Sequence, residues 1–238
     1  MRRAAVVATI ALATLAAGAG TARATNECRG LQACVKVAGP WVVVPASNSS
    51  QRPRVEFQLS CPRGFVVGGL DAELSDRAID VHFYGKLGSP VNPGITTSRA
   101  AVFVATFAGG AGRATTFKPH LGCVPASGGG GGPVPFRLPS AAAVPPGQPP
   151  VRRLRTVRLR AGATQRAAQG CGAGERLVGA WHAVGFQTRT APTAVQIGGV
   201  HATHTVRAGR VAAVVRTSPA VAGVRAIVQV GAVCAGGS

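Results

Sequence analysis

Two pairs of cysteines frame two segments of nearly equal length, and this feature limits most strongly how the chain can fold. The pairs are Cys61 with Cys123 and Cys171 with Cys234. The stretches 99–123 and 210–234, each ending at the second cysteine of its pair, align without a gap. In both copies, glycine follows three positions after the first cysteine. The pattern therefore indicates a duplicated module in which each copy carries its own cysteine pair.

The duplication selects one pairing among the six cysteines. Each copy must be able to close on itself, and the two N-terminal cysteines then pair with each other. We expect three disulfides: Cys28–Cys34, Cys61–Cys123 and Cys171–Cys234. Closing a loop as long as those in the two copies removes roughly 4 kcal/mol of denatured-state entropy. With all six cysteines paired, we expect no thiolate for metal binding or for nucleophilic catalysis.

Apolar and polar residues alternate along several segments of both copies. Val55 and Phe57 lie on one side of such a segment, and the alternation recurs at 79–84 and 224–230. A period of two indicates β-strands with one buried face, and 100–107, apolar on both faces, indicates a central strand. The sequence therefore predicts an all-β fold of two tandem antiparallel β-sandwich-like modules, each closed by one disulfide and joined by a linker.

Composition divides the chain into four parts. Arg2-Arg3 precedes an uncharged apolar run at 4–17 and a small-x-small site at 22–24, which is typical of a secretory signal peptide and too short to span a membrane. A later stretch is rich in glycine and proline and contains five consecutive glycines. The predicted parts are a signal peptide at 1–24, a first β-module with an N-terminal cysteine clip at 25–124, a linker at 125–150 and a second β-module at 151–238.

The first module carries a short recognisable pattern. Cys61-Pro62-Arg63-Gly64 is followed by Val67-Gly68-Gly69 and by a closing cysteine about sixty residues later. This resembles the tandem two-cysteine β-modules of exported proteins from high-GC bacteria. The second copy departs from the pattern, with Gly172 in place of the proline and Gly179-Ala180 in place of the double glycine. The resemblance implies a secreted, all-β, duplicated protein and carries over no activity.

The charge of the chain is strongly positive and unevenly distributed. The formal net charge is +19, and from residue 151 onward twelve arginines accompany one acid, Glu175. Such an imbalance favours anionic partners, and in an exported protein these are acidic polymers or glycans of the cell envelope. The alternative is a coding bias, because arginine far outnumbers lysine and alanine, glycine and valine are abundant.

One predicted strand concentrates this charge. If Val157 and Leu159 face the core, then Thr156, Arg158 and Arg160 line the exposed side of the strand. Guanidinium groups placed there can bind phosphate or carboxylate groups. The candidate anion-binding residues are Arg152, Arg153, Arg155, Arg158 and Arg160. Stacking aromatics are not interleaved with them, so we do not expect specific nucleic-acid recognition. The alternative is an edge strand protected by charge against aggregation.

A second candidate lies in the first module. The only acidic cluster is Asp71, Glu73, Asp76 and Asp80, which a glycosidase or a calcium site would need to bring together. The second copy does not repeat these acids, so we expect a solvated loop. The alternative function is a secreted hydrolase or protease inhibitor that acts through loops of the first module such as 85–97.

Other catalytic or metal-binding patterns are missing from the sequence. His201 and His204 are three residues apart, and on a strand they would point to opposite faces and not share an ion. The remaining histidines are isolated in sequence, and no serine lies in a nucleophile-elbow motif. We therefore expect no enzyme activity, cofactor or metal, and predict a secreted binding or structural protein.

Overall fold

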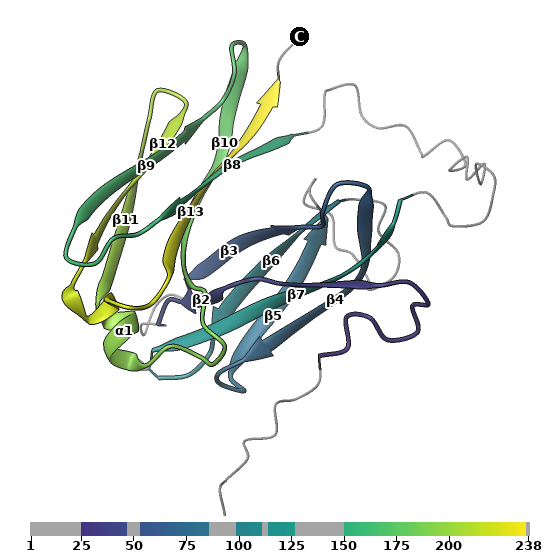
Figure 1. The fold of residues 1–238 in the computed structure, drawn as a ribbon. Helices are drawn as coiled ribbons and strands as arrows, with labels where there is room; N and C mark the ends of the chain where they lie inside the picture. Colours follow the sequence, from purple (N-terminus) through teal and green to yellow (C-terminus); the bar gives the residue numbers. More distant parts are fainter. Residues whose placement is uncertain (1–24, 47–52, 86–98, 111–113, 127–149, 237–238) are drawn as a thin grey trace, which may run out of the picture.

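The computed structural model of this protein describes residues 25–46, 53–85, 99–110, 114–126 and 150–236 (Figure 1). The predicted signal peptide and most of the predicted linker lie outside these residues. The described chain is built almost wholly of antiparallel strands, with one five-residue α-helix, so the predicted all-β class is confirmed. None of the helices in the described ranges is long and apolar enough to cross a membrane.

The first half of the described chain forms two packed layers of strands. One layer has the order β3-β6-β5, and in the other β7 pairs with β4 along one edge and with β1 and then β2 along the opposite edge. The strands are β1 Val35–Ala38, β2 Trp41–Val44, β3 Arg54–Ser60, β4 Phe65–Leu74, β5 Ile79–Gly85, β6 Ala100–Phe107 and β7 Thr115–Pro125. Phe103, Phe107 and Phe117 are fully buried between the layers.

The second half has the same arrangement of strands. One layer has the order β11-β12-β9 and the other the order β10-β13-β8, so β12 and β13 take the central places held by β6 and β7. The elements are β8 Val151–Arg158, β9 Thr164–Gly170, β10 Glu175–Phe186, α1 Ala194–Gly198, β11 Val200–Arg207, β12 Arg210–Thr217, the 3-10 turn η1 Pro219–Val221 and β13 Ala226–Gly236. In both halves the strand register shifts by one residue opposite the second cysteine of the pair.

The three predicted disulfides are present. In the second half Cys171 follows β9 of one layer, and Cys234 lies in β13 of the other. Cys61 and Cys123 tie β3 to β7 in the same way. Each long disulfide therefore clamps the two layers of its own sandwich together.

The short disulfide Cys28–Cys34 holds the N-terminal segment against β4 and β7. The backbone of Glu27 lies where side-chain atoms would stand at Gly69 and Gly122, so only glycine permits this close approach at the two positions. Glu27 itself is buried, and its carboxylate lies 3.5 Å from the Lys36 ammonium. The predicted N-terminal clip is thus packed on the first half.

The two halves of the described chain are in direct contact. Trp41 of β2 pairs with Phe186 of β10, which makes one continuous seven-stranded sheet out of the two larger layers. Trp41 also belongs to the core of the second half, while Ala183 and Ile227 belong to the core of the first. The sequence left open whether the halves pack together, and the structure shows that they do.

A buried glutamine completes the contact between the halves. The Gln229 side chain on β13 accepts a hydrogen bond from the Gln58 backbone N–H at 2.8 Å and donates one to the Gln58 carbonyl at 3.0 Å. Gln58 lies on β3, and these two backbone groups face away from its partner strand β6. Gln229 is only 3% exposed, so no water replaces it readily.

Replacing Gln229 by methionine is therefore expected to lower the free energy of unfolding by about 1–3 kcal/mol, because two buried backbone groups lose their partners. The matched control is Gln187→Met, since Gln187 is exposed. Urea unfolding followed by circular dichroism measures both variants. Equal midpoints for the two variants would show that the Gln58–Gln229 contact contributes nothing to the packing of the halves.

Candidate anion-binding surface

The predicted arginine-rich strand is β8, which lies at an edge of the large sheet and pairs only with β13 among the described strands. Val157 and Leu159 pack into the core of the second half, as the alternation predicts. Thr156, Arg158 and Arg160 are exposed. Arg153 and Arg155 lie on the same side of the strand as Val157, so both sides of β8 carry arginines.

Two of the five candidate arginines are already paired with carboxylates. Arg152 lies 2.8 Å from Glu56 of β3 and 5.0 Å from the centre of the Trp181 ring, so it links the two halves of the chain. Arg153 lies 2.7 Å from Glu175, and its hydrogen bond, with a second from the Gly172 N–H, lowers the pKa of Glu175. These two side chains are engaged in ion pairs within the chain, whereas Arg155, Arg158 and Arg160 remain exposed.

Arg158 and Arg160 line a groove of about 550 Å³ at the end of β8. The side chain of Gln165 shapes the turn there, because it accepts from the Arg160 N–H at 2.6 Å and donates to the Arg158 carbonyl at 3.2 Å. The hydroxyl of Thr217, on β12, donates a hydrogen bond to the Arg160 carbonyl. The backbone of this basic turn is thus fixed by neutral side chains, and its guanidinium groups point to solvent.

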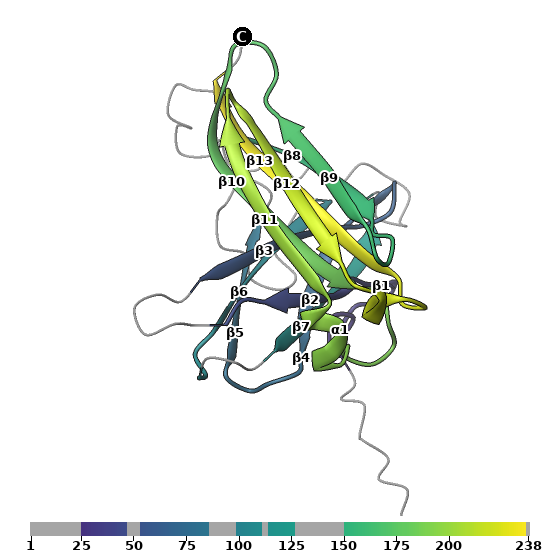
Figure 2. The same cartoon turned by 90° about the vertical axis from the view of Figure 1, so that its left-hand side faces the viewer.

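A second group of arginines lies on the outer side of the β11-β12-β9 sheet, which faces the viewer in Figure 2. Val211, Ala213 and Val215 of β12 are buried, so the alternate residues of this strand face outward. The strand register places residues of β9 and β11 on the same outer side. We call this surface the arginine face, and its basic residues are Arg166, Arg207, Arg210, Arg216 and His201, all exposed.

The tightest part of the arginine face is a hairpin turn. Arg207 ends β11 and Arg210 begins β12, directly opposite each other across Ala208 and Gly209. Both turn residues have positive φ, 46° for Ala208 and 72° for Gly209, as a two-residue turn of this kind requires. Alanine pays a steric penalty in this conformation. The turn therefore holds two like charges together at a cost in stability.

These two arginines line a groove of about 300 Å³ together with Arg166. Its other lining residues are small, namely Ala168, Thr205 and Ala212. The Arg210 side chain lies close over Gly170, where a larger residue would displace it. The result is a shallow groove with a small-residue floor and three guanidinium groups at its sides.

The arginine face has no carboxylate of its own. The sequences of β9, β11 and β12 contain neither aspartate nor glutamate. Glu175, the single acid after residue 151, is bound by Arg153. Within the described residues, the arginine face therefore has an uncompensated positive charge that attracts anions.

Sequence reasoning missed the arginine face because its members are spread over three strands. Arg166, Arg207 and Arg210 are up to 44 positions apart and meet only through the register of β9, β12 and β11. Arg210 and Arg216 lie an even number of positions apart in an otherwise apolar strand, which was a usable signal that both point to the same side. The hairpin that opposes Arg207 to Arg210 was not evident from the sequence alone.

The acidic cluster of the first half is occupied by internal contacts. Asp71 accepts a hydrogen bond from the Asn26 N–H at 2.6 Å, Glu73 lies 2.7 Å from a ring nitrogen of His120, and Asp80 lies 3.0 Å from His82. In the part of the chain that the structure describes, the only three-residue group with metal-ligand spacing is Cys171, Glu175 and Cys234. Its two cysteines are joined in a disulfide. Most of the loop 85–97 lies outside the described residues.

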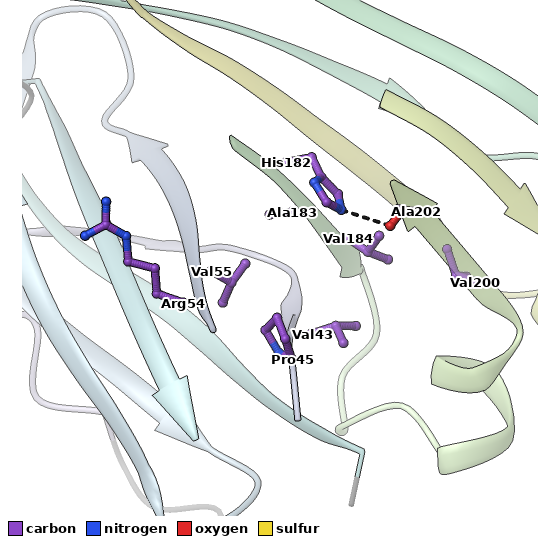
Figure 3. Close-up of a pocket in the computed structure, with 9 residues that line it drawn as sticks. All are labelled: Val43, Pro45, Arg54, Val55, His182, Ala183, Val184, Val200 and Ala202. Atoms are coloured by element: carbon purple, nitrogen blue, oxygen red, sulfur yellow. Dashed lines mark hydrogen bonds between the residues drawn. The ribbon is translucent and has the colours of Figure 1, made fainter. Parts of the chain in front are cut away.

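A further groove of about 220 Å³ lies at the seam of the two halves (Figure 3). Val43, Pro45 and Val55 form the wall from the first half, with Arg54 at its rim, and Val184 lies in the wall from the second. Arg54 lies 3.4 Å from Glu56. This groove is mainly apolar and does not extend the arginine face.

Comparison of the chain with models of known families, with curated proteins and with solved structures found no match.

Proposed function

We propose that this is a secreted, non-enzymatic protein of two duplicated β-modules that binds an anionic or glycan polymer of the cell envelope through its second module. The observation that carries the proposal is the pair Arg207 and Arg210, opposed across a strained turn on three strands that contain no aspartate or glutamate. A bound anion offsets the repulsion between the two guanidinium groups. Exposed like charges held at a cost in stability are expected where a ligand compensates them.

The chemistry of the ligand follows from the guanidinium group. Its planar donors match the two oxygens of a phosphate or carboxylate, and such charge-assisted hydrogen bonds are stronger than neutral ones. The groove beside Arg166, Arg207 and Arg210 is shallow and open, which suits a repeating polymer more than a small molecule that must be enclosed. The exposed Arg158 and Arg160, together with Arg155 on the other side of β8, add further positive charge on the same half.

Export and duplication are supported by separate observations. Three disulfides with no free cysteine are typical of chains that fold in an oxidising compartment, and the N-terminal sequence is typical of a signal peptide. The same strand order and the same position of the register shift in both halves support descent from one module.

The test of this function compares two soluble polymers. The purified, oxidised chain is titrated with fluorescently labelled inorganic polyphosphate and with neutral dextran at low salt. We expect binding of polyphosphate that weakens as salt is added, and no binding of dextran. Binding to dextran that resists salt would replace the polyanion with a neutral glycan as the ligand, and no binding to either polymer would contradict the proposal.

A further inference from the structure

Two histidines that are far apart in the sequence meet at the open edge of the second sandwich. His182 lies on β10 and His204 on β11, which belong to different sheets. Their Nδ1 atoms are 2.7 Å apart, and their ring centroids are 4.9 Å apart. The sequence indicated that His182 was isolated, and the structure corrects this.

The hydrogen bonds define which nitrogen of His182 is free to act as a ligand. Its Nε2 lies 3.2 Å from the carbonyl oxygen of Ala202, and a carbonyl only accepts, so Nε2 carries the proton (Figure 3). Nδ1 of His182 therefore presents a lone pair toward His204.

We propose that His182 and His204 form a binding site for one divalent transition metal ion of the zinc, copper and nickel class, held by the two Nδ1 atoms. Neutral imidazole is a preferred ligand of these ions. The Ala202 carbonyl orients the His182 ring as outer hydrogen-bond partners orient histidine ligands in metal sites. Zinc–nitrogen bonds are about 2.0–2.1 Å long, so two nitrogens must stand somewhat farther apart than 2.7 Å to share an ion.

The exposed ring of His204 can move to give the larger nitrogen–nitrogen distance that a shared ion requires. His204 is exposed, so its ring can turn outward and carry its proton on Nε2, in contact with water. His182 is half-buried and also lines the groove at the seam of the two halves. No net proton is released, because each neutral ring keeps one proton on its Nε2.

The site has two protein ligands and is therefore open. In the described residues, no carboxylate or cysteine completes the pair into a three-residue group. Water or a group from another molecule fills the remaining positions of the ion. His201 does not take part, because it lies opposite Arg216 on the arginine face, while His204 points to the other side of β11.

The experiment is isothermal titration calorimetry of the oxidised chain, purified without a histidine tag, with ZnCl₂ at pH 7.5. We expect one zinc ion per chain and no heat from MgCl₂, since magnesium prefers oxygen ligands. His204→Ala should weaken zinc binding by at least about tenfold. His201→Ala, on the same strand with the opposite orientation, should leave it unchanged.

A second readout identifies the ligands. Zinc should shift the ring-nitrogen resonances of two histidines in the wild type and of none in His204→Ala, with circular dichroism confirming that the variant is folded. Absence of stoichiometric zinc binding in the wild type would overturn the proposal. So would zinc binding of full strength in a folded His204→Ala variant, because the ion would then be held elsewhere.

Discussion

A chain in which Cys171 and Cys234 are both replaced by alanine is expected to lose about 4 kcal/mol of its free energy of unfolding. The two cysteines are 63 positions apart, and their bond joins β9 to β13 across the layers of the second sandwich. Without the bond, the denatured chain regains the freedom of that loop. A half of this size buries too little surface to absorb the loss easily.

The short disulfide provides the matched comparison. Cys28 and Cys34 are six positions apart, so replacing both by alanine should cost only about 2 kcal/mol in the same entropic description. Urea unfolding of the two variants and of the wild type gives the three free energies. An equal loss in both variants would show that loop closure is not the source of the stabilisation.

Replacing Arg166, Arg207 and Arg210 by serine is expected to weaken polyphosphate binding by about 100-fold at low salt. Each exposed ion pair contributes at most about 1 kcal/mol, and three such contacts together give an effect of this order. The fold should tolerate the change, because all three side chains are exposed. Removing the repulsion between Arg207 and Arg210 should even stabilise the hairpin slightly.

Two further triple variants remove the same charge elsewhere. Serine at Arg155, Arg158 and Arg160 tests the basic strand that the sequence identified, and we expect a smaller loss of affinity, below about tenfold. Serine at three exposed arginines that line neither of the two basic grooves described above should have less effect still, and these are Arg176, Arg189 and Arg225. Equal losses in all three variants would show that net charge alone attracts the polymer and that the arginine face is not a site.

The sequence was most informative where the structure depends on local patterns. Alternation at segments such as 224–230 indicates strands because a strand side chain points to one face or the other at every second residue. The cysteine pairs followed from the duplication, and the class and the disulfides were predicted correctly. These features need no knowledge of which strand lies beside which.

The candidate sites were less predictable because they depend on contacts between distant strands. Arg152 was a candidate ligand-binding residue, and only the packing of the two halves shows that Glu56 already neutralises it. The Arg207–Arg210 pair depends on Ala208, which adopts a left-handed conformation that alanine rarely takes. The contact of His182 with His204 joins two sheets, and spacing along the chain carries no information about it.

The salt dependence of polyphosphate affinity tests the central claim most directly. Each cation that contacts a phosphate contributes roughly 0.7–0.9 to the slope of log affinity against log salt concentration. If the arginine face binds the polymer, the variant lacking Arg166, Arg207 and Arg210 should have a slope smaller by about two to three, while the Arg176, Arg189 and Arg225 variant keeps the wild-type slope. Identical slopes for the wild type and the arginine-face variant would contradict the account.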